Sequence, residues 1–438
     1  MSGVWRESPI AWRWMVPLAA ILGLIAVPGV EADDWPQWRG PERNGKSAET
    51  GLLDEWPAEG PPLAWQAAGL GGGYSSLSIV DGRIFTMGDI GETQYVVAIT
   101  EDGGDPLWKT EVGPFWEDEY GGPRATPTID GDRLYALGTF GDLVCLETAT
   151  GREIWRRNLQ EEFGGDLMKA MGQYDWRYAE SPLVDGDKVI VTPGAPEAMV
   201  VALDKTSGEE IWRATIPELG EAGADGAAYS SIVISHGGGV KQYVQLVGRG
   251  VIGLEAETGR FLWGYNRVAN DIANIPTPIV HGDYVFASSG YGTGSALLRL
   301  VPTEDGVSAE EVYFLEGSVM QNHHGGLILD DGYVYTGTGH NKGFPMSVRF
   351  EDGEVVWGPV RTDGRGSAAV TFADDRLYFR YQDGTMVLVE ATPEEFRQHG
   401  TFVIPEVDNF SWSHPVVSDG KLYLREQDRL YVYDVSGG

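Results

Sequence analysis

Three histidines close together, His323, His324 and His340, are the groups in this sequence whose chemistry is most suggestive. Neutral imidazole is a common ligand of transition metals, so these side chains are weak candidates for a metal site. However, no carboxylate follows them at a recognised metal-binding spacing, and a polar entrance to a strand explains the three residues as well. We therefore predict no metal site.

Other familiar catalytic motifs are incomplete. The glycine-rich stretch at residues 290–294 joins two candidate strands, whereas a nucleotide-binding loop leads into a helix. Ser75, Ser230 and Ser231 lack the Gly-x-Ser-x-Gly context of a hydrolase nucleophile. Cys145 is the only cysteine and sits in an apolar run, so we expect it to be buried. The sequence predicts no catalytic residue.

The elements that must position any site come from one unit that recurs along the chain. Residues 126–155 read as four short strands joined by tight turns at Asp130-Gly131, Phe140-Gly141-Asp142 and Thr148 to Gly151. Leu134, Tyr135, Ala136 and Leu137 are consecutive and apolar, so both faces of that strand must be covered. Such a small sheet needs a similar sheet on each side.

The repeat can be counted from its turns and from the aromatic residue of its closing strand. Both signals occur eight times, and the closing residues are Trp65, Trp108, Trp155, Trp212, Trp263, Tyr313-Phe314, Trp357 and Phe402. The last unit ends without a closing strand, while Trp65 supplies one with no unit before it. We therefore predict an all-β, eight-bladed β-propeller of four-stranded blades, whose ring is closed by the N-terminal strand. The spacing is about 47 residues per blade.

The N-terminal segment divides into two parts. Residues 1–32 combine Arg6 and Arg13 with an apolar run and small residues before Asp33, which predicts a cleaved signal peptide and a periplasmic or secreted protein. An uncleaved anchor is the alternative, although the run is short for a membrane span. Residues 33–62 form an arm outside the repeat, which we expect to lie across the ring with Trp35 and Trp38 in grooves, and residues 63–438 form the propeller.

The formal net charge of −33 limits the possible partners. A field of this sign repels nucleic acid and anionic membrane surfaces, so we expect neither as a partner. After signal cleavage we expect no membrane span, and we expect a monomer.

The repeat resembles that of the pyrroloquinoline quinone (PQQ) type β-propeller family. The resemblance rests on the Asp-Gly turn, the aromatic strand and the Thr-Gly-x-x-x-Trp ending, which are clearest at residues 131–155, 186–212 and 251–263. The family includes quinoprotein alcohol dehydrogenases and BamB, a non-enzymatic propeller of outer-membrane barrel assembly. It implies either an oxidoreductase that uses PQQ with Ca²⁺ or a binding scaffold. The adjacent cysteines and the calcium-loop spacing that such dehydrogenases use are missing from this sequence.

A binding site is expected at one mouth of the central channel. In a propeller the first strand of each blade lines the axis, where only small side chains fit. Bulkier residues stand just before these strands and should ring the mouth: Tyr74, Arg124, Glu180, Tyr229, Asn274, Asn322, His323, Arg365 and Trp412. Rigid aromatic side chains with Arg and His suit a protein segment or a small ligand. A ring that only seals the channel around water is the alternative.

These observations together favour an exported, non-catalytic propeller that binds a protein or a small ligand, with a role in cell-envelope or outer-membrane protein assembly. We expect no cofactor. The alternative is a PQQ-dependent oxidoreductase similar to alcohol dehydrogenases.

Overall fold

The computed structural model describes residues 1–3 and 34–437. The predicted signal peptide and its cleavage site fall on residues 4–33, outside the described residues. Within the described part of the chain, no helix combines the length and the apolar character that crossing a membrane requires.

The described strands form eight four-stranded antiparallel sheets, which we number as blades 1 to 8 in chain order. Blades 1 to 4 are built from β2 (Ser78–Val80), β3 (Arg83–Ile90), β4 (Thr93–Thr100) and β5 (Pro106–Pro114); β6 (Thr128–Asp130), β7 (Arg133–Leu137), β8 (Asp142–Glu147) and β9 (Glu153–Asn158); β10 (Leu183–Asp185), β11 (Lys188–Val191), β12 (Val200–Asp204) and β13 (Glu210–Ala214); and β14 (Val233–Ser235), β15 (Gln242–Val247), β16 (Gly250–Glu255) and β17 (Phe261–Tyr265).

Blades 5 to 8 follow the same order, except that the last one takes its outer strand from the N-terminal side. They are built from β18 (Ile279–His281), β19 (Tyr284–Ser289), β20 (Gly294–Thr303) and β21 (Gly306–Glu316); β22 (Leu327–Asp330), β23 (Tyr333–Thr338), β24 (Phe344–Arg349) and β25 (Val355–Trp357); β26 (Ala368–Ala373), β27 (Arg376–Tyr381), β28 (Thr385–Glu390) and β29 (Gln398–Val403); and β30 (Val416–Ser418), β31 (Lys421–Glu426), β32 (Arg429–Asp434) and β1 (Leu63–Ala68). A short helix, α1 (Leu159–Phe163), and a 3-10 turn, η1 (Gly237–Gly239), complete the elements.

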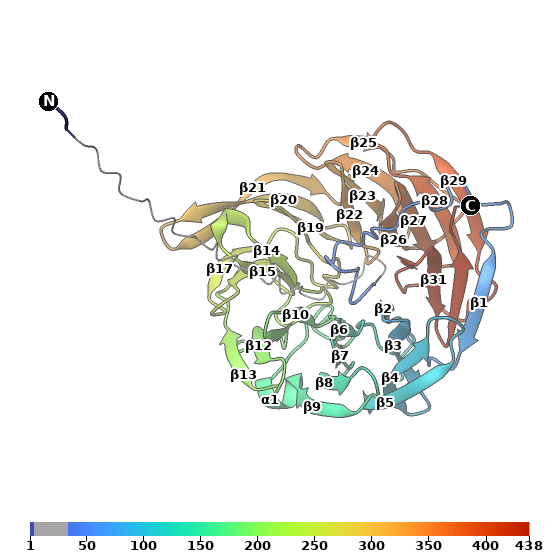
Figure 1. Cartoon of the computed structure of the whole chain (residues 1–438), viewed down its shortest axis with the longest axis horizontal. Coiled ribbons are helices and arrows are strands. Elements are labelled where there is room, and N and C mark those ends of the chain that lie inside the picture. The colour runs from blue at the N-terminus through green and yellow to red at the C-terminus, as the bar shows by residue number, and fades with distance from the viewer. Residues whose placement is uncertain (4–33, 438) are drawn as a thin grey trace. The chain divides into compact units, whose positions relative to one another are not determined.

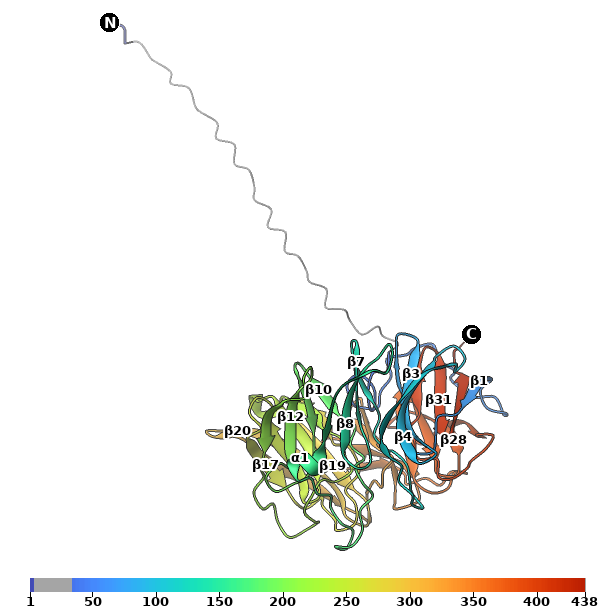
Figure 2. The ribbon, with the colours of Figure 1, turned by 90° about the horizontal axis from the view of Figure 1, so that it is seen from below.

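The N-terminal strand closes the ring. β1 pairs antiparallel with β32, with Trp65 opposite Val432 and Gln66 opposite Tyr431. Figure 1 shows the chain passing around the ring until the red C-terminal blade meets the blue β1. Figure 2 shows the same ring from the side, with the strands of the nearest blades running between its two faces. The predicted eight blades and the predicted closure are confirmed.

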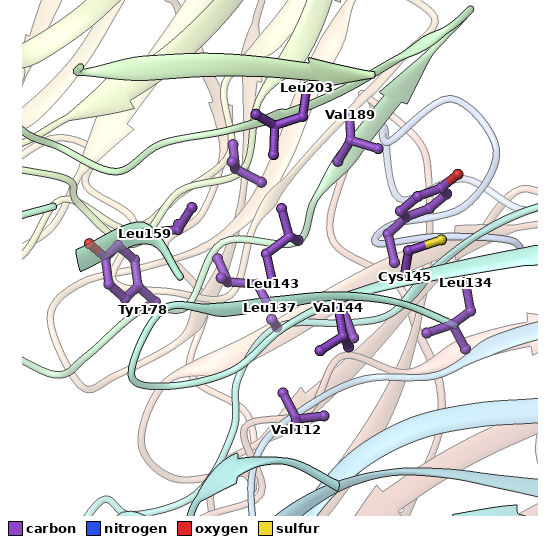
Figure 3. Close-up of a cluster of buried hydrophobic side chains, with 14 of the residues drawn as sticks. Val112, Leu134, Leu137, Leu143, Val144, Cys145, Leu159, Tyr178, Val189 and Leu203 are labelled. Carbon is purple, nitrogen blue, oxygen red and sulfur yellow. The ribbon is translucent and has the colours of Figure 1, made fainter. Parts of the chain in front are cut away.

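The core lies between neighbouring blades rather than in one central mass. Leu134, Tyr135, Ala136 and Leu137 of β7 are all buried, so both faces of this strand are covered as the sequence predicts. Figure 3 shows the cluster around β7 and β8, in which Cys145 is one of the buried side chains and packs among residues of three blades. Each sheet is therefore stabilised mainly by its two neighbours.

At several positions around the ring, the aromatic residue of an outer strand fastens one blade to the next. Trp155 of β9 lies against Gly208, in the turn that leads into β13, where an added Cβ atom would stand 2.8 Å from the indole. The Trp155 Nε1–H group donates a hydrogen bond to the carbonyl oxygen of Lys205 at 3.1 Å in the same turn. The same contact recurs between Trp108 and Gly151, Trp212 and Gly259, Tyr313 and Gly353, and Trp65 and Gly104.

The arm enters the centre of the ring. Trp35 forms a backbone pair with Ile79 of β2, with both N–H···O distances at 2.8 Å, and is buried. Further along, the buried Arg43 side chain donates to the carbonyl oxygens of Ser181 at 3.0 Å and Ile232 at 2.7 Å. These carbonyls belong to the inner ends of blades 3 and 4, so the arm extends from blade 1 to the inner ends of these two blades.

The arm also contacts blades 6 to 8. Arg39 donates through Nη2 to the carbonyl oxygen of Leu327 in β22, and Lys46 forms a bridge with Phe372 of β26. Leu52 forms a bridge with Ser436, just after β32. The arm therefore contacts blades on both sides of the ring.

Glu180 is a buried carboxyl just before β10, the inner strand of blade 3. Its oxygens accept hydrogen bonds from the Thr192 N–H at 2.7 Å, the Thr192 hydroxyl at 3.0 Å and the Gln245 amide at 3.2 Å. Burial raises the pKa of Glu180 to about 8, although the Thr192 hydrogen bonds and the nearby Arg43 charge act in the opposite direction. The carboxyl therefore binds a proton more tightly in the folded chain than in the unfolded one.

We predict that Trp155→Ala destabilises the ring by about 3–5 kcal/mol through the cavity it leaves. Gly208→Ala should be destabilising for two reasons: its φ of +72° disfavours a Cβ atom, and that atom would collide with Trp155. In the Trp155→Ala background only the backbone strain remains, so the second substitution should cost less there. Denaturation midpoints of the four proteins measure this coupling, and strictly additive shifts would contradict the contact.

A truncation tests the closure. Deleting residues 34–68 removes β1 and leaves β32 as an open edge, so we expect oligomers or aggregates by size-exclusion chromatography with light scattering. The control deletion of residues 34–60 removes the arm but keeps β1, and it should lower the melting temperature while leaving a monomer. A monomeric 34–68 deletion with the wild-type melting temperature would show that β1 does not close the ring.

A pH titration of stability tests the Glu180 environment. Because its folded pKa of about 8 lies above the ordinary pKa of 4.5 for a Glu carboxyl, its contribution to stability is full below pH 4.5 and is lost as the pH rises through 8. Glu180→Gln mimics the protonated carboxyl, so the variant should lose less stability than the wild type between pH 5 and 8. Melting temperatures of both proteins across this range measure the difference. Subtracting one curve from the other removes the contribution of the histidines, which both proteins share. Parallel curves would contradict the raised pKa.

Candidate functional site

A cavity of about 360 Å³ lies where the inner strands of the blades begin. Its wall comes from the segments just before these strands, at Tyr74, Arg124, Trp176, Ala179, Tyr229, Ala273, Ile275 to Thr277, His323, His324 and Trp412. The ring brings these segments together because the first strand of every blade starts at the same end of the channel. Side chains from blades more than 300 residues apart in the sequence therefore share one cavity.

The predicted mouth residues separate into three groups. Tyr74, Arg124, Tyr229, His323 and Trp412 line the cavity. Glu180, Asn274 and Asn322 are buried in the blades and are not among the lining residues. Arg365 is exposed and lines a separate surface depression with Asn341 and Lys342.

The two buried asparagines hold the connections before their inner strands. The Asn274 amide donates to the Gly248 carbonyl oxygen at 3.0 Å and its oxygen accepts from the Ser289 hydroxyl at 2.9 Å. The Asn322 amide donates to the Thr336 hydroxyl at 2.7 Å and to the Gly326 carbonyl oxygen at 3.1 Å. These bonds satisfy buried polar groups, so the two side chains position the wall without forming it.

Several lining residues were not among the predicted mouth residues. Tyr291, His340 with Asn341, and Gln382 stand in the turns between the second and third strands of blades 5, 6 and 7. In an antiparallel blade this turn lies at the same end as the start of the first strand, so the strand order could have indicated them. Trp38 and Arg39 come from the arm, and Tyr120, Trp176 and Phe410 come from connections between blades. No repeat marks these five positions.

Three aromatic rings form a stacked wall on one side of the cavity. The ring centroids of Phe410 and Trp412 are 4.7 Å apart with the planes 12° from parallel, and Tyr120 stacks on Trp412 at 5.6 Å. Tyr74 also contacts Trp412, at 4.9 Å between centroids. This wall offers a flat apolar surface of rigid side chains.

Four histidines line the same cavity, namely His323, His324, His340 and His414. His323 is held through both ring nitrogens, with Nδ1 2.7 Å from the Ser367 hydroxyl and Nε2 3.0 Å from the Tyr291 hydroxyl. Burial lowers the pKa of His324 and of His414 to about 3, and burial with the neighbouring imidazoles lowers the pKa of His323 well below its usual value. The imidazoles are therefore neutral at pH 7.

Two arginines bring positive charge to the lining. Arg124 donates through Nη1 to the carbonyl oxygens of Trp176 and Gly122 and through Nη2 to that of Tyr120. Its guanidinium carbon stands 4.8 Å from the ring centroid of Trp116. Arg39, which belongs to the arm, is the second arginine in the lining. Burial lowers the pKa of each arginine to about 10, so both remain cations at neutral pH.

The arm forms the floor of the cavity. Arg39 lines this cavity and also a second one of about 760 Å³. Ala273 and Ile275 to Thr277 line the first cavity and residues 278–281 line the second, so the two cavities lie at successive levels along β18 and the segment before it. The arm separates them, and the Trp38 indole nitrogen donates to the Thr277 hydroxyl at 3.1 Å between the two levels.

The lining residues do not fit PQQ with its Ca²⁺ ion. Calcium requires several oxygen ligands, usually carboxylates, and none of the lining side chains is Asp or Glu. The predicted carboxyl, Glu180, is buried and bonded to Thr192 and Gln245. Among residues 1–3 and 34–437, no group of three His, Cys, Asp or Glu side chains is placed to hold a metal ion, and both ring nitrogens of His323 already have partners.

Comparisons with known proteins agree with this architecture. A model of the PQQ-repeat family described as "Outer membrane protein assembly factor BamB" matches residues 92–359. The protein of that name from Xanthomonas campestris pv. campestris is 28% identical over 113 residues, 26% of each chain, and that from Nitrosomonas eutropha is 26% identical over 180 residues, 41% of this chain and 36% of the relative. A quinohemoprotein alcohol dehydrogenase, ADH IIB of Pseudomonas putida, is 25% identical over 165 residues, 36% of this chain and 22% of the relative.

The matched stretch spans well under half the length of each of these relatives. Among solved structures, BamB of Moraxella catarrhalis superposes with a TM-score of 0.53 at 14% identity, covering 80% of this chain and 93% of that one. The quinohemoprotein alcohol dehydrogenase of Comamonas testosteroni gives 0.62 at 13% identity, covering 93% and 81%. Identities this low support the fold alone. Because the family model covers more than half of the sequence, the chain belongs to the BamB family of PQQ-repeat β-propellers.

Proposed function

We propose that this protein is an exported, non-catalytic propeller of the cell envelope that binds a partner segment or a small ligand in the cavity at the channel mouth and takes part in outer-membrane protein assembly. The observation that carries the proposal is the cavity itself. It combines a stacked aromatic wall, neutral imidazoles and fixed guanidinium groups on a rigid ring.

The dimensions and the lining of the cavity support a binding role. Ligand pockets in proteins usually measure about 300–1,000 Å³ and place a few polar groups among apolar walls, as this cavity of about 360 Å³ does. Tyr and Trp side chains provide contact area at a low entropic cost, which is why they dominate recognition surfaces.

The protonation states of the lining argue against acid–base chemistry. A general base works best when its pKa lies near the operating pH. The pKa values of His324 and His414 are about 3, and those of His323 and His340 are also lowered, so these groups are weak bases at neutral pH. No carboxylate stands among the lining residues to take that role.

The place of the protein in the cell is part of the proposal. The signal-like segment at residues 1–32 and the membership in the BamB family both support the cell envelope. With a net charge of −33 the protein should avoid nucleic acid and anionic lipid surfaces, and we propose that it acts as a monomer.

A complementation experiment tests the proposal. In a Gram-negative strain that lacks its own BamB, the wild-type chain should raise the abundance of outer-membrane proteins. A Tyr120→Ala and Trp412→Ala double variant, which removes the aromatic wall, should lose most of this effect at equal expression. Leu107→Ala, at an exposed position of β5, serves as the matched control and should act like the wild type. Quantitative mass spectrometry of outer membranes gives the readout.

Two outcomes would contradict the proposal. Equal complementation by the Tyr120→Ala and Trp412→Ala double variant and the wild type would show that the function does not require the aromatic wall of the cavity. Reduction of a redox dye by the protein with PQQ, Ca²⁺ and an alcohol, lost in Arg124→Gln, would show an oxidoreductase instead of a binding protein.

A further inference from the structure

The cavity is positively charged although the protein is strongly acidic. The sequence has 65 Asp and Glu against 32 Lys and Arg, yet no acidic side chain lines the cavity. The charged groups in its lining are Arg39 and Arg124, and neither forms an ion pair among the described residues. An uncompensated cation in a poorly solvated place is costly, and an anion at that place removes the cost.

Both guanidinium groups have N–H donors that lack a protein partner. A guanidinium has five N–H donors. Arg124 places three of them on backbone carbonyls, which fixes its orientation and leaves two without a protein partner. Arg39 uses Nη2 for the carbonyl oxygens of Asn44 and Leu327, while its buried Nε and Nη1 have no partner. Two rigid forks with free N–H groups therefore line one cavity.

The imidazoles add further unpaired polar atoms. His324 Nε2, His340 Nδ1 and His414 Nδ1 are buried without a hydrogen-bond partner. Neutral imidazole can donate or accept, so these rings do not repel an anion and can bind its polar substituents. Between these polar groups stand the stacked rings of Tyr120, Phe410 and Trp412.

We propose that the cavity selects a flat aromatic group that carries a carboxylate. The source is either a small aromatic acid or the C-terminal aromatic residue of a peptide, which presents the same two features. This inference rests on the proposed binding function and adds the chemical class of the ligand. The carboxylate pairs with the free N–H groups of Arg124 or Arg39, and the ring lies against the aromatic wall.

Other ligand classes match the lining less well. A cationic ligand would face two guanidinium groups with no carboxylate to balance it. A neutral sugar would leave the guanidinium charges unpaired, although the wall could stack on it. A carboxylate matches the planar fork of Arg with two parallel hydrogen bonds. The arm also closes the floor below the wall, so a chain end can enter the cavity while a continuing strand cannot pass through.

Titration calorimetry on the full-length mature protein tests the proposal with matched ligands. The probes are 1-naphthoate and its neutral amide, and the peptide Ala-Gly-Ala-Phe with a free or an amidated C-terminus. In each pair the acid should bind at least about 10-fold more tightly than the amide, because a charge-assisted hydrogen bond replaces a neutral one. Whichever acid binds more tightly identifies the source of the ligand.

Variants locate the binding. Arg124→Gln should weaken the acid by about 10-fold and leave the amide nearly unchanged, whereas Tyr120→Ala should weaken both. Arg365→Gln makes the same chemical change at an exposed arginine outside the cavity and should bind like the wild type. Melting temperatures identify any variant that fails to fold, and the comparison of acid with amide on the wild type needs no variant.

The outcomes separate this inference from the proposed function. Amides that bind as tightly as the acids, with affinity lost in Tyr120→Ala, would overturn the anion selectivity and leave the binding function standing. Acid binding that is unaffected by Arg124→Gln and Tyr120→Ala would overturn the location and with it the inference. No binding of any of the four probes would also overturn the inference, while complementation would still test the function.

Discussion

The contact between an aromatic ring on one blade and a turn glycine on the next is the interaction on which the structure depends. A four-stranded blade has two apolar faces and cannot be stable alone. The indole of Trp155 lies on Gly208 and also donates to the carbonyl oxygen of Lys205. One residue therefore supplies both an apolar contact and a directional hydrogen bond between the two blades. The same contact joins neighbouring blades at Trp65, Trp108, Trp212 and Tyr313, and the pairing of β1 with β32 closes the ring.

The ring then determines where chemistry can gather. Antiparallel blades bring the start of their first strand and their second turn to the same end of the channel, and there Trp412 meets Tyr74 from the other end of the propeller sequence. The arm supplies what the blades do not. Its Arg43 bonds to the inner ends of blades 3 and 4, while Trp38 and Arg39 form the floor of the cavity. The closure of the ring by β1 and the floor of the cavity therefore both depend on the N-terminal segment.

Much of this organisation could be predicted from the sequence. The Thr-Gly-x-x-x-Trp ending marks the outer strand because it contains both partners of the contact between blades, and it led to the correct blade number and closure. The rule that bulky residues precede the inner strand named Tyr74, Arg124, Tyr229, His323 and Trp412, all of which line the cavity.

The rest could not be predicted because it depends on packing that no repeat encodes. Asn274 and Asn322 satisfy buried carbonyls inside the blades, which a residue type alone does not reveal. Arg365 stands between Gly364 and Gly366, which pack closely against Tyr381 and Gln382, and it lines a separate depression. Tyr120 and Phe410 lie in connections of irregular length, and their stacking on Trp412 became visible only in three dimensions.

Experimental electron density for the protein purified from its own cell envelope would test the central claim most directly. The account predicts density for a flat group in the cavity, against Trp412 and with an anionic end at Arg124 or Arg39. A bound molecule at another surface, such as the depression beside Arg365, with only ordered water between Trp412 and Arg124, would contradict it.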